Sequence, residues 1–204
     1  MQFYRLPLTT NKLLSFNQDK FSFHTAESRG DSCHLLLSFS THFTMNIFDA
    51  IKSQNVVKVK ELLEQNPDCV NHRDERGSSP LLLATYLGDK TIIDILLAHT
   101  SNVDARDAMG NTALMGVCFK GYVDVAQALI EAGADVNALN SGHTSALTFA
   151  AMFGKDKIIQ LLLSSGADPN IKDQQGMTAL DHAKAREQQQ VVAILSPLTA
   201  PSNG

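Results

Sequence analysis

The sequence of 204 residues has no tryptophan and only three cysteines, Cys33, Cys69 and Cys118. The number is odd and the spacing contains no CxxC pair, which argues against a disulfide framework and fits a reducing compartment. No apolar run approaches the roughly 20 residues that a membrane helix needs. Arg5 and Lys12 interrupt the N-terminal stretch, so it lacks the continuous apolar core of a signal peptide. We therefore expect a cytoplasmic protein.

Sequence patterns of known catalytic and metal sites are also missing. There is no GxxxxGK[ST], no HExxH and no GxGxxG. Cys118 has no base placed beside it and is expected to be a buried thiol rather than a nucleophile. Cys33 and His34, with His24 and His42 nearby, match no zinc spacing. We expect a protein that is not an enzyme and that holds no metal and no cofactor.

Charge of one sign is in slight excess, and the sign is negative. The formal net charge is −4, from 17 basic and 21 acidic residues. The first 44 residues hold four of the basic and three of the acidic ones, which leaves 13 and 18 for the rest, a net charge of −5. A domain with this net negative charge gains little binding energy from nucleic-acid phosphates or anionic lipid. We expect no nucleic-acid partner and no membrane partner. The composition, with 44% hydrophobic and 19% charged residues, is typical of a globular chain.

What the sequence does have is a period of 33 residues. One column of hydroxyl residues consists of Ser79, Thr112, Ser145 and Thr178. A column of leucines consists of Leu81, Leu114, Leu147 and Leu180. A column of glycines consists of Gly88, Gly121 and Gly154. Self-similarity at a fixed period of this length indicates a repeat architecture.

Each unit predicts two helices. Ser79 and Pro80 offer a cap and a favoured first residue for a short helix, which a glycine such as Gly121 ends. The second helix has apolar residues at helical spacing, for example Val125, Ala126, Leu129 and Ile130. Gly133 follows where a left-handed cap belongs. The loop aspartates Asp104, Asp135 and Asp168 are expected to make turn hydrogen bonds.

The unit GNTALMGVCFKGYVDVAQALIEAGADVN, residues 110–137, resembles the ankyrin-repeat family, and the resemblance covers about residues 46–195. It implies an all-α ankyrin-repeat solenoid of about five helix–turn–helix units with terminal caps. One feature departs from the family. The histidine of the usual Thr-Pro-Leu-His tetrapeptide is replaced at all four positions, by Leu82, Met115, Thr148 and Asp181. We expect the hydrogen bonds of that histidine to be absent or replaced, with some loss of rigidity.

The register sets the expected domain boundaries. The ankyrin-repeat domain covers 45–196, with units at about 45–73, 74–106, 107–139, 140–172 and 173–196. Residues 1–44 show no repeat, and we expect them to be unstructured or to precede a true start at Met45. Residues 197–204 are expected to be a disordered tail.

The resemblance implies that partners bind in a concave groove formed by the first helices and the loop tips. Six candidate residues lie just before the glycine column: Tyr86, Leu87, Phe119, Lys120, Met152 and Phe153. The five apolar ones predict a ridge across three units, with Lys120 beside them. Three more flank it from the loops: Arg76, Met109 and Asn111. An exposed apolar surface of this kind indicates an interaction site. The alternative is that Phe119 and Phe153 pack between the helices.

These features favour a protein–protein interaction module that acts as an adaptor or inhibitor through the concave ankyrin groove. The expected partner is another protein, and we expect the chain to be a monomer. Two alternatives stay open: an ankyrin-type effector that targets a host protein, and a non-catalytic subunit of an enzyme complex.

Overall fold

The computed structural model describes residues 45–100 and 102–199. The expectations for residues 1–44 fall outside the described residues, as do those for residues 200–204. Within the described residues the chain forms ten α-helices, one 3₁₀ helix and no strand, with a single isolated bridge between Leu139 and Ser145. The expected all-α class is therefore confirmed.

The helices alternate between the two kinds that the repeat predicts. The first helices of the units are α1 (Ile47–Lys52), α3 (Pro80–Leu87), α5 (Ala113–Lys120), α7 (Ala146–Met152) and α9 (Ala179–Ala185). The second helices are α2 (Val56–Gln65), α4 (Lys90–His99), α6 (Val123–Glu131), α8 (Asp156–Ser164) and α10 (Gln189–Leu195). The 3₁₀ helix η1 (Pro67–Asn71) follows α2.

The column of hydroxyl residues caps the first helices. The Ser79 hydroxyl oxygen accepts from the Leu82 amide at 3.2 Å, and Thr112, Ser145 and Thr178 cap α5, α7 and α9 in the same way. Helices α3 and α5 end at glycines in the left-handed conformation, Gly88 at φ 79° and Gly121 at φ 96°. These helices therefore begin and end where the 33-residue pattern predicts.

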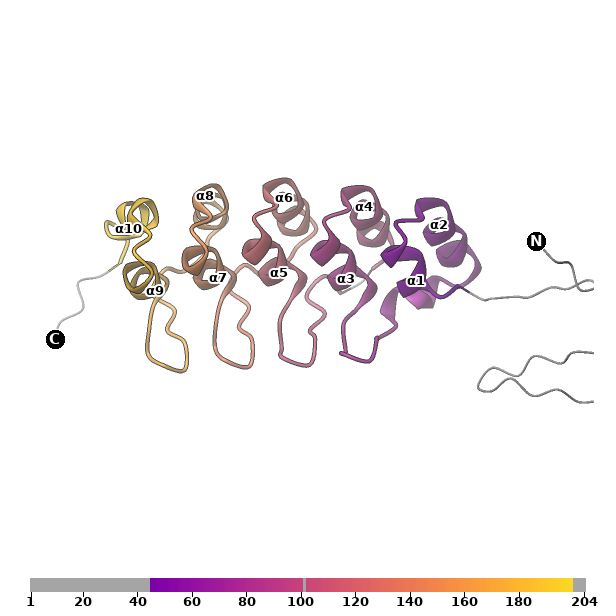
Figure 1. Ribbon diagram of the computed structural model, residues 1–204, viewed down its shortest axis with the longest axis horizontal. Helices are drawn as coiled ribbons and strands as arrows, with labels where there is room; N and C mark the ends of the chain where they lie inside the picture. The colour runs from indigo at the N-terminus through magenta and orange to yellow at the C-terminus, as the bar shows by residue number, and fades with distance from the viewer. Residues whose placement is uncertain (1–44, 101, 200–204) are drawn as a thin grey trace, which may run out of the picture. The chain divides into compact units, whose positions relative to one another are not determined.

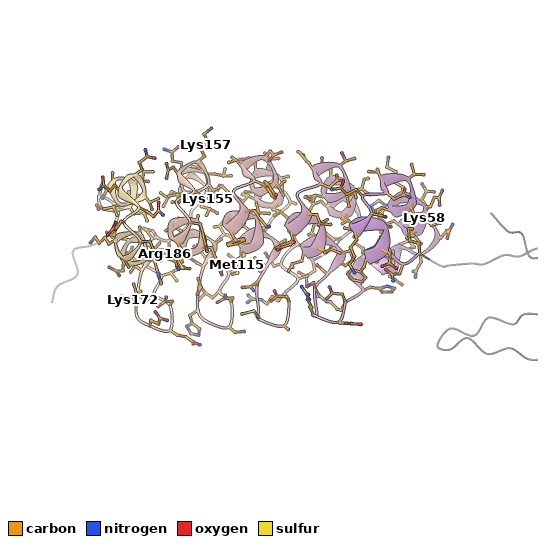
Figure 2. The ribbon with its side chains drawn as sticks, viewed as in Figure 1. Lys58, Met115, Lys155, Lys157, Lys172 and Arg186 are labelled. Carbon is orange, nitrogen blue, oxygen red and sulfur yellow. The ribbon has the colours of Figure 1, made fainter. Side chains whose placement is uncertain are left out.

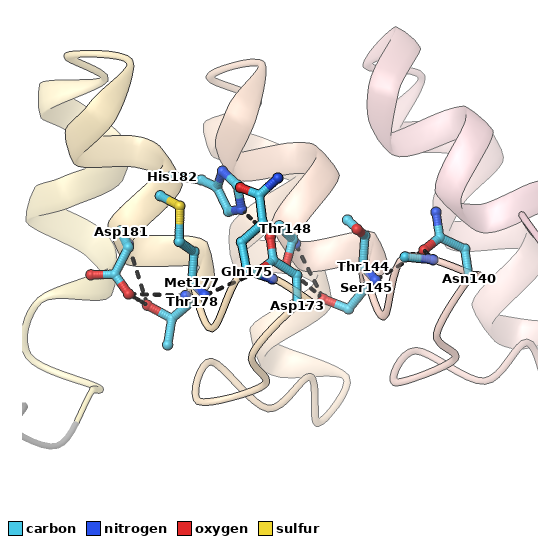
Figure 3. Close-up of polar contacts among 11 residues, drawn as sticks. Asn140, Thr144, Ser145, Thr148, Asp173, Gln175, Met177, Thr178, Asp181 and His182 are labelled. Atoms are coloured by element: carbon cyan, nitrogen blue, oxygen red, sulfur yellow. Dashed lines mark hydrogen bonds and ion pairs between the residues drawn. The ribbon is translucent and has the colours of Figure 1, made fainter.

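Hydrogen bonds local to each cap replace those of the missing histidine in three units. The Asp181 carboxylate accepts from the Thr178 hydroxyl at 2.7 Å and from the Thr178 amide at 2.9 Å (Figure 3). The hydroxyls of Ser145 and Thr148 lie 3.1 Å apart, within hydrogen-bond distance. Met115 accepts from the Thr112 amide through its sulfur at 3.5 Å. Only the fourth position, Leu82, has an aliphatic side chain that cannot bond in this way.

The units stack in line, with the first helices in one row, the second helices in another and the loops projecting on one side (Figure 1). Each first helix packs against the next, and so does each second helix. The column of leucines lies at equivalent places in this stack, with Leu81, Leu114 and Leu147 each 1% exposed and Leu180 7% exposed. One apolar core runs through all units, so each unit covers the apolar side of its neighbour.

Hydrogen bonds also join the loops of neighbouring units. The Asp104 carboxylate accepts from the Asp135 amide at 3.0 Å, and the Asn137 side chain accepts from the Asp168 amide at 2.8 Å. Asp135 and Asp168 each accept from the amide two residues on, at 2.9 Å. The structural role expected for these aspartates is therefore confirmed.

The described cysteines are buried thiols. Cys118 is fully buried in α5, and burial raises the pKa of its thiol well above the usual range. Cys69 is 6% exposed and lies within 3.7 Å of the Leu62 carbonyl, and burial again raises the pKa of its thiol. Both sulfurs stay protonated at neutral pH and are poor nucleophiles. None of the helices in the described ranges is long and apolar enough to cross a membrane.

Candidate functional site

The ridge lies where the first helices end and the chain turns toward the second helices. Tyr86 is the second-last residue of α3, Phe119 and Lys120 are the last two of α5, and Met152 and Phe153 end α7. Because the units stack in register, these residues form a row across neighbouring repeats. Arg186, the cap residue of α9, extends the row into a fourth unit.

Aromatic and cation–π contacts connect the row from end to end. The Lys120 ammonium lies 4.0 Å from the centre of the Tyr86 ring, which belongs to the preceding unit. The rings of Phe119 and Phe153 meet edge to face, with their centres 4.6 Å apart. The guanidinium of Arg186 lies 5.5 Å from the centre of the Phe153 ring. The contacts hold the exposed side chains in fixed places, so less conformational entropy is lost when a partner binds.

The aromatic members of the ridge are exposed. Tyr86 is 55% exposed, Phe119 40% and Phe153 37%, so the alternative in which the two phenylalanines pack between the helices is wrong. Met152 is half-buried, and Leu87 packs against the core. The accessible ridge therefore consists of the three rings and the two cations, while Leu87 mainly supports it.

The cations of the ridge have no carboxylate partner in the described part of the chain. Neither Lys120 nor Arg186 forms an ion pair there, unlike Lys58 and Lys90, which are paired with Glu61 and Asp94. Arg186 lies at the level of the first helices (Figure 2). The ridge is therefore positive as well as aromatic.

The candidate loop residues lie apart from the ridge. Met109 is 68% exposed and Arg76 is exposed. Arg76 precedes α3 and Met109 precedes α5, whereas the ridge lies where these helices end. Helix α5 has eight residues, so the two ends are about 12 Å apart. Asn111 uses its side chain within the fold, since it donates to Asp107 at 3.1 Å and accepts from Asn140 at 2.9 Å. The nine candidates thus form two strips, one at the beginning and one at the end of the first helices.

A row between the two strips was missed in the sequence. It lies one helical turn before the ridge and consists of Leu83, Gly116, Phe149 and His182, all partly exposed. Gly116 is the exception in this row because it has no side chain. A Cβ atom added there would have no neighbour within 4 Å. Close packing therefore does not require this glycine, and the space that a side chain would take up at residue 116, called the notch below, is open. The same spacing of 33 residues carried the signal, but the row mixes residue types.

The Gly116→Ala variant should be more stable than the natural chain. Glycine inside a helix is less favourable than alanine by about 0.5–1 kcal/mol, and nothing in the structure opposes the added methyl group. The urea midpoint, followed by circular dichroism, should rise by the corresponding amount. A fall would show that the notch is filled by a neighbouring group.

A hydrogen-bonded pair of a histidine and an aspartate occupies the last unit of the same surface. The His182 imidazole lies 2.6 Å from the Asp173 carboxylate, and both side chains are largely buried (Figure 3). Burial opposes the charge of Asp173, but hydrogen bonds from His182 and from the amides of Met177 and Gln175 outweigh it, so the pKa of Asp173 is lowered. The pair fixes the loop before α9 against the helix. Its role is structural.

The Asp173→Asn variant tests this pair through pH. A carboxyl group whose pKa is lowered in the folded state stabilises the fold above its unfolded pKa, near 3.9, and loses that contribution as pH falls through the folded value. The natural chain should therefore lose its advantage over Asp173→Asn progressively as the pH falls below about 5. Asn140 holds the equivalent loop with an amide that accepts from Gly142 and Thr144, so asparagine suits this place. Urea midpoints of both proteins at several pH values measure the difference; a constant gap would contradict the assignment.

The architecture and the surface define a class: a solenoid of stacked helix pairs whose continuous face is available to a macromolecule. Family models agree with the class and make it specific. A model described as ankyrin repeats (3 copies) matches residues 47–140, and one described as ankyrin repeats (many copies) matches residues 147–195. The chain belongs to the ankyrin-repeat family. A comparison with curated proteins gave no match.

Membership of the family indicates the general activity. Ankyrin repeats mediate binding to other proteins and are in general non-catalytic, so the chain is a protein–protein interaction module. Within the described residues, no group of three or more metal-ligating side chains comes together.

Proposed function

We propose that the chain is an adaptor or inhibitor that binds its partner protein along the ridge formed by Tyr86, Phe119, Lys120, Phe153 and Arg186. One observation carries the proposal: three aromatic rings in three consecutive units are exposed, yet they are held by contacts to one another and to cations. Aromatic and arginine side chains supply most of the binding energy at protein interfaces.

The remaining candidate residues have supporting parts in this proposal. Met152 and Leu87 fill the ridge from beneath, while Arg76 and Met109 would contact a partner large enough to reach the loops. Asn111 acts through the loop structure that it maintains. Such a division agrees with interfaces in which a few central residues dominate and their neighbours exclude water.

The Phe119→Ala/Phe153→Ala double variant should lose partner capture. Each aromatic anchor contributes about 2 kcal/mol or more at such interfaces, so the loss of one should lower the affinity about 30-fold and the loss of both should lower it further. The unfolding free energy should fall by roughly 2–4 kcal/mol, because each phenylalanine is about three-fifths buried and the two rings contact each other, so the capture is measured under conditions in which circular dichroism shows the variant to be folded. Proteins retained by the immobilised chain and by the double variant, identified by mass spectrometry, provide the measurement.

Val57→Ala is the matched control for this experiment. Val57 is 67% exposed on α2 and lies outside the ridge, so its truncation removes apolar surface without affecting the proposed contact. Proteins that bind the natural chain and the Val57→Ala variant, but not the double variant, support the proposal. Capture that survives in the double variant places the interface elsewhere.

A further inference from the structure

The ridge has a charge opposite to that of the chain around it. Residues 45–204 carry 13 basic and 18 acidic side chains, but both ionic side chains of the ridge, Lys120 and Arg186, are cations. We propose that the ridge binds an extended segment of the partner protein that carries carboxylates separated by apolar side chains. The proposal rests on the proposed function and states the chemistry of the partner.

The cations are positioned but not neutralised. The ring of Tyr86 orients the Lys120 ammonium at 4.0 Å, and the ring of Phe153 faces the Arg186 guanidinium at 5.5 Å. No carboxylate of the described residues lies within 4.0 Å of either group. A carboxylate that approaches from the partner would form a new ion pair with a group whose side chain is already ordered, which lowers the entropic cost of the contact.

The distance between the cations sets the spacing of the carboxylates. Lys120 ends α5 and Arg186 caps α9, so they lie two units apart in the stack. Neighbouring helices pack about 8–10 Å apart, which places the two cations roughly 16–20 Å from each other along the row. An extended chain advances about 3.3 Å per residue, so the acidic residues of the partner should be about five or six positions apart.

The notch at Gly116 supplies the apolar part of the site. It lies on α5 in the row next to the ridge, one helical turn before Lys120, and Leu83 and Phe149 occupy the equivalent positions in the neighbouring units. The space that a Cβ atom would enter is open, so an aliphatic side chain of the partner can lie there. A methyl group at residue 116 would occupy that space without harming the fold.

Single-stranded nucleic acid also binds surfaces that combine aromatic rings with cations. Here the rings are poorly arranged for base stacking. Cations cover one face of Tyr86 and one face of Phe153, and Phe119 meets Phe153 at an interplanar angle of 86°. The net charge of −5 on residues 45–204 also disfavours a polyanion with many phosphates. A short acidic peptide needs only two favourable sites, so the structure favours a protein partner.

The experiment selects peptides from a random 12-residue phage library on the immobilised full chain, and measures the affinity of the selected peptides by fluorescence polarisation. We expect acidic residues five or six positions apart with apolar residues between them. The Lys120→Gln/Arg186→Gln variant should bind these peptides about tenfold more weakly, because two exposed ion pairs are lost. Gly116→Ala should also weaken binding, although it stabilises the fold.

Lys157→Gln/Lys172→Gln is the matched control, because it removes the same charge from the outer helix α8 and from a loop tip (Figure 2). Equal losses in the two charge variants would overturn the inference, and so would neutral or basic selected peptides, or no enrichment over the Lys120→Gln/Arg186→Gln protein. Neutral peptides whose binding needs Phe119 would contradict the acidic character of the partner, while the ridge would still be the interface. Peptides that bind equally well to the natural chain and to a Phe119→Ala variant would contradict the proposed function itself, because binding would not use the ridge. Binding of a 20-nucleotide single strand that is lost in the Lys120→Gln/Arg186→Gln variant would overturn the inference in favour of a nucleic-acid partner.

Discussion

The Leu114→Ala variant should lose about 3 kcal/mol of unfolding free energy. Leu114 is 1% exposed in α5, which packs against α3 on one side and α7 on the other. Truncation leaves a cavity in the middle of a continuous core, where neighbouring helices cannot collapse into it without breaking register. Urea unfolding followed at 222 nm measures the loss.

Two further variants make this expectation specific to the stack. Leu180→Ala removes the same side chain from α9, which has one neighbouring first helix among the described residues and leaves Leu180 7% exposed. Stability of a repeat array is a sum of unit and nearest-neighbour terms, so this loss should be smaller. Val57→Ala, on an exposed residue, should change the stability by less than about 0.5 kcal/mol. Equal losses for Leu114→Ala and Val57→Ala would contradict the stacked core.

The fold could be predicted from the sequence because each unit repeats the same capping, turn and core residues at the same positions. A hydroxyl residue such as Ser79 can cap only at a helix start, and Gly88 takes the left-handed conformation that ends α3. Leu81 and its counterparts then have to face the same side of each unit. Local preference and long-range packing agree at every repeat, so the period alone determined the architecture.

The contacts of the ridge did not follow from the sequence, for a physical reason. The period places Lys120 at the end of a helix, but its long side chain has many rotamers and several possible partners. Only the stacked structure brings the Tyr86 ring of the neighbouring unit within 4.0 Å of its ammonium group. The internal role of Asn111 is equally hidden, since it depends on Asn140 in the next loop.

The separation of the loop strip from the ridge was hidden for a different reason. Sequence columns show which residues occupy equivalent places in each unit, but they do not show how far apart two columns lie. Met109 and Phe119 belong to one unit, yet the length of α5 lies between them. A single partner segment on the ridge therefore leaves Met109 free, which makes the two strips separable by mutation.

The Gly88→Ala variant should be destabilised by about 2–4 kcal/mol through two independent effects. Gly88 has φ 79°, and an alanine in the left-handed region costs about 1 kcal/mol. In addition, a Cβ atom would lie 2.7 Å from the Tyr122 ring of the next unit, which packs against the core. Overpacking of this kind costs about 1–3 kcal/mol. Urea unfolding of the single variants provides the measurement.

Gly133 separates the two effects, because it has φ 91° but no atom within 4 Å of its added Cβ. Gly133→Ala should therefore show the conformational cost alone, about 1 kcal/mol. The remaining loss in Gly88→Ala belongs to the contact between units, so it should disappear when Tyr122 is also truncated to alanine. A double-mutant cycle on Gly88 and Tyr122 should accordingly give a coupling energy of about 1 kcal/mol or more. A coupling energy near zero would mean that the Tyr122 ring swings aside freely, and that this glycine column serves only to end the helices.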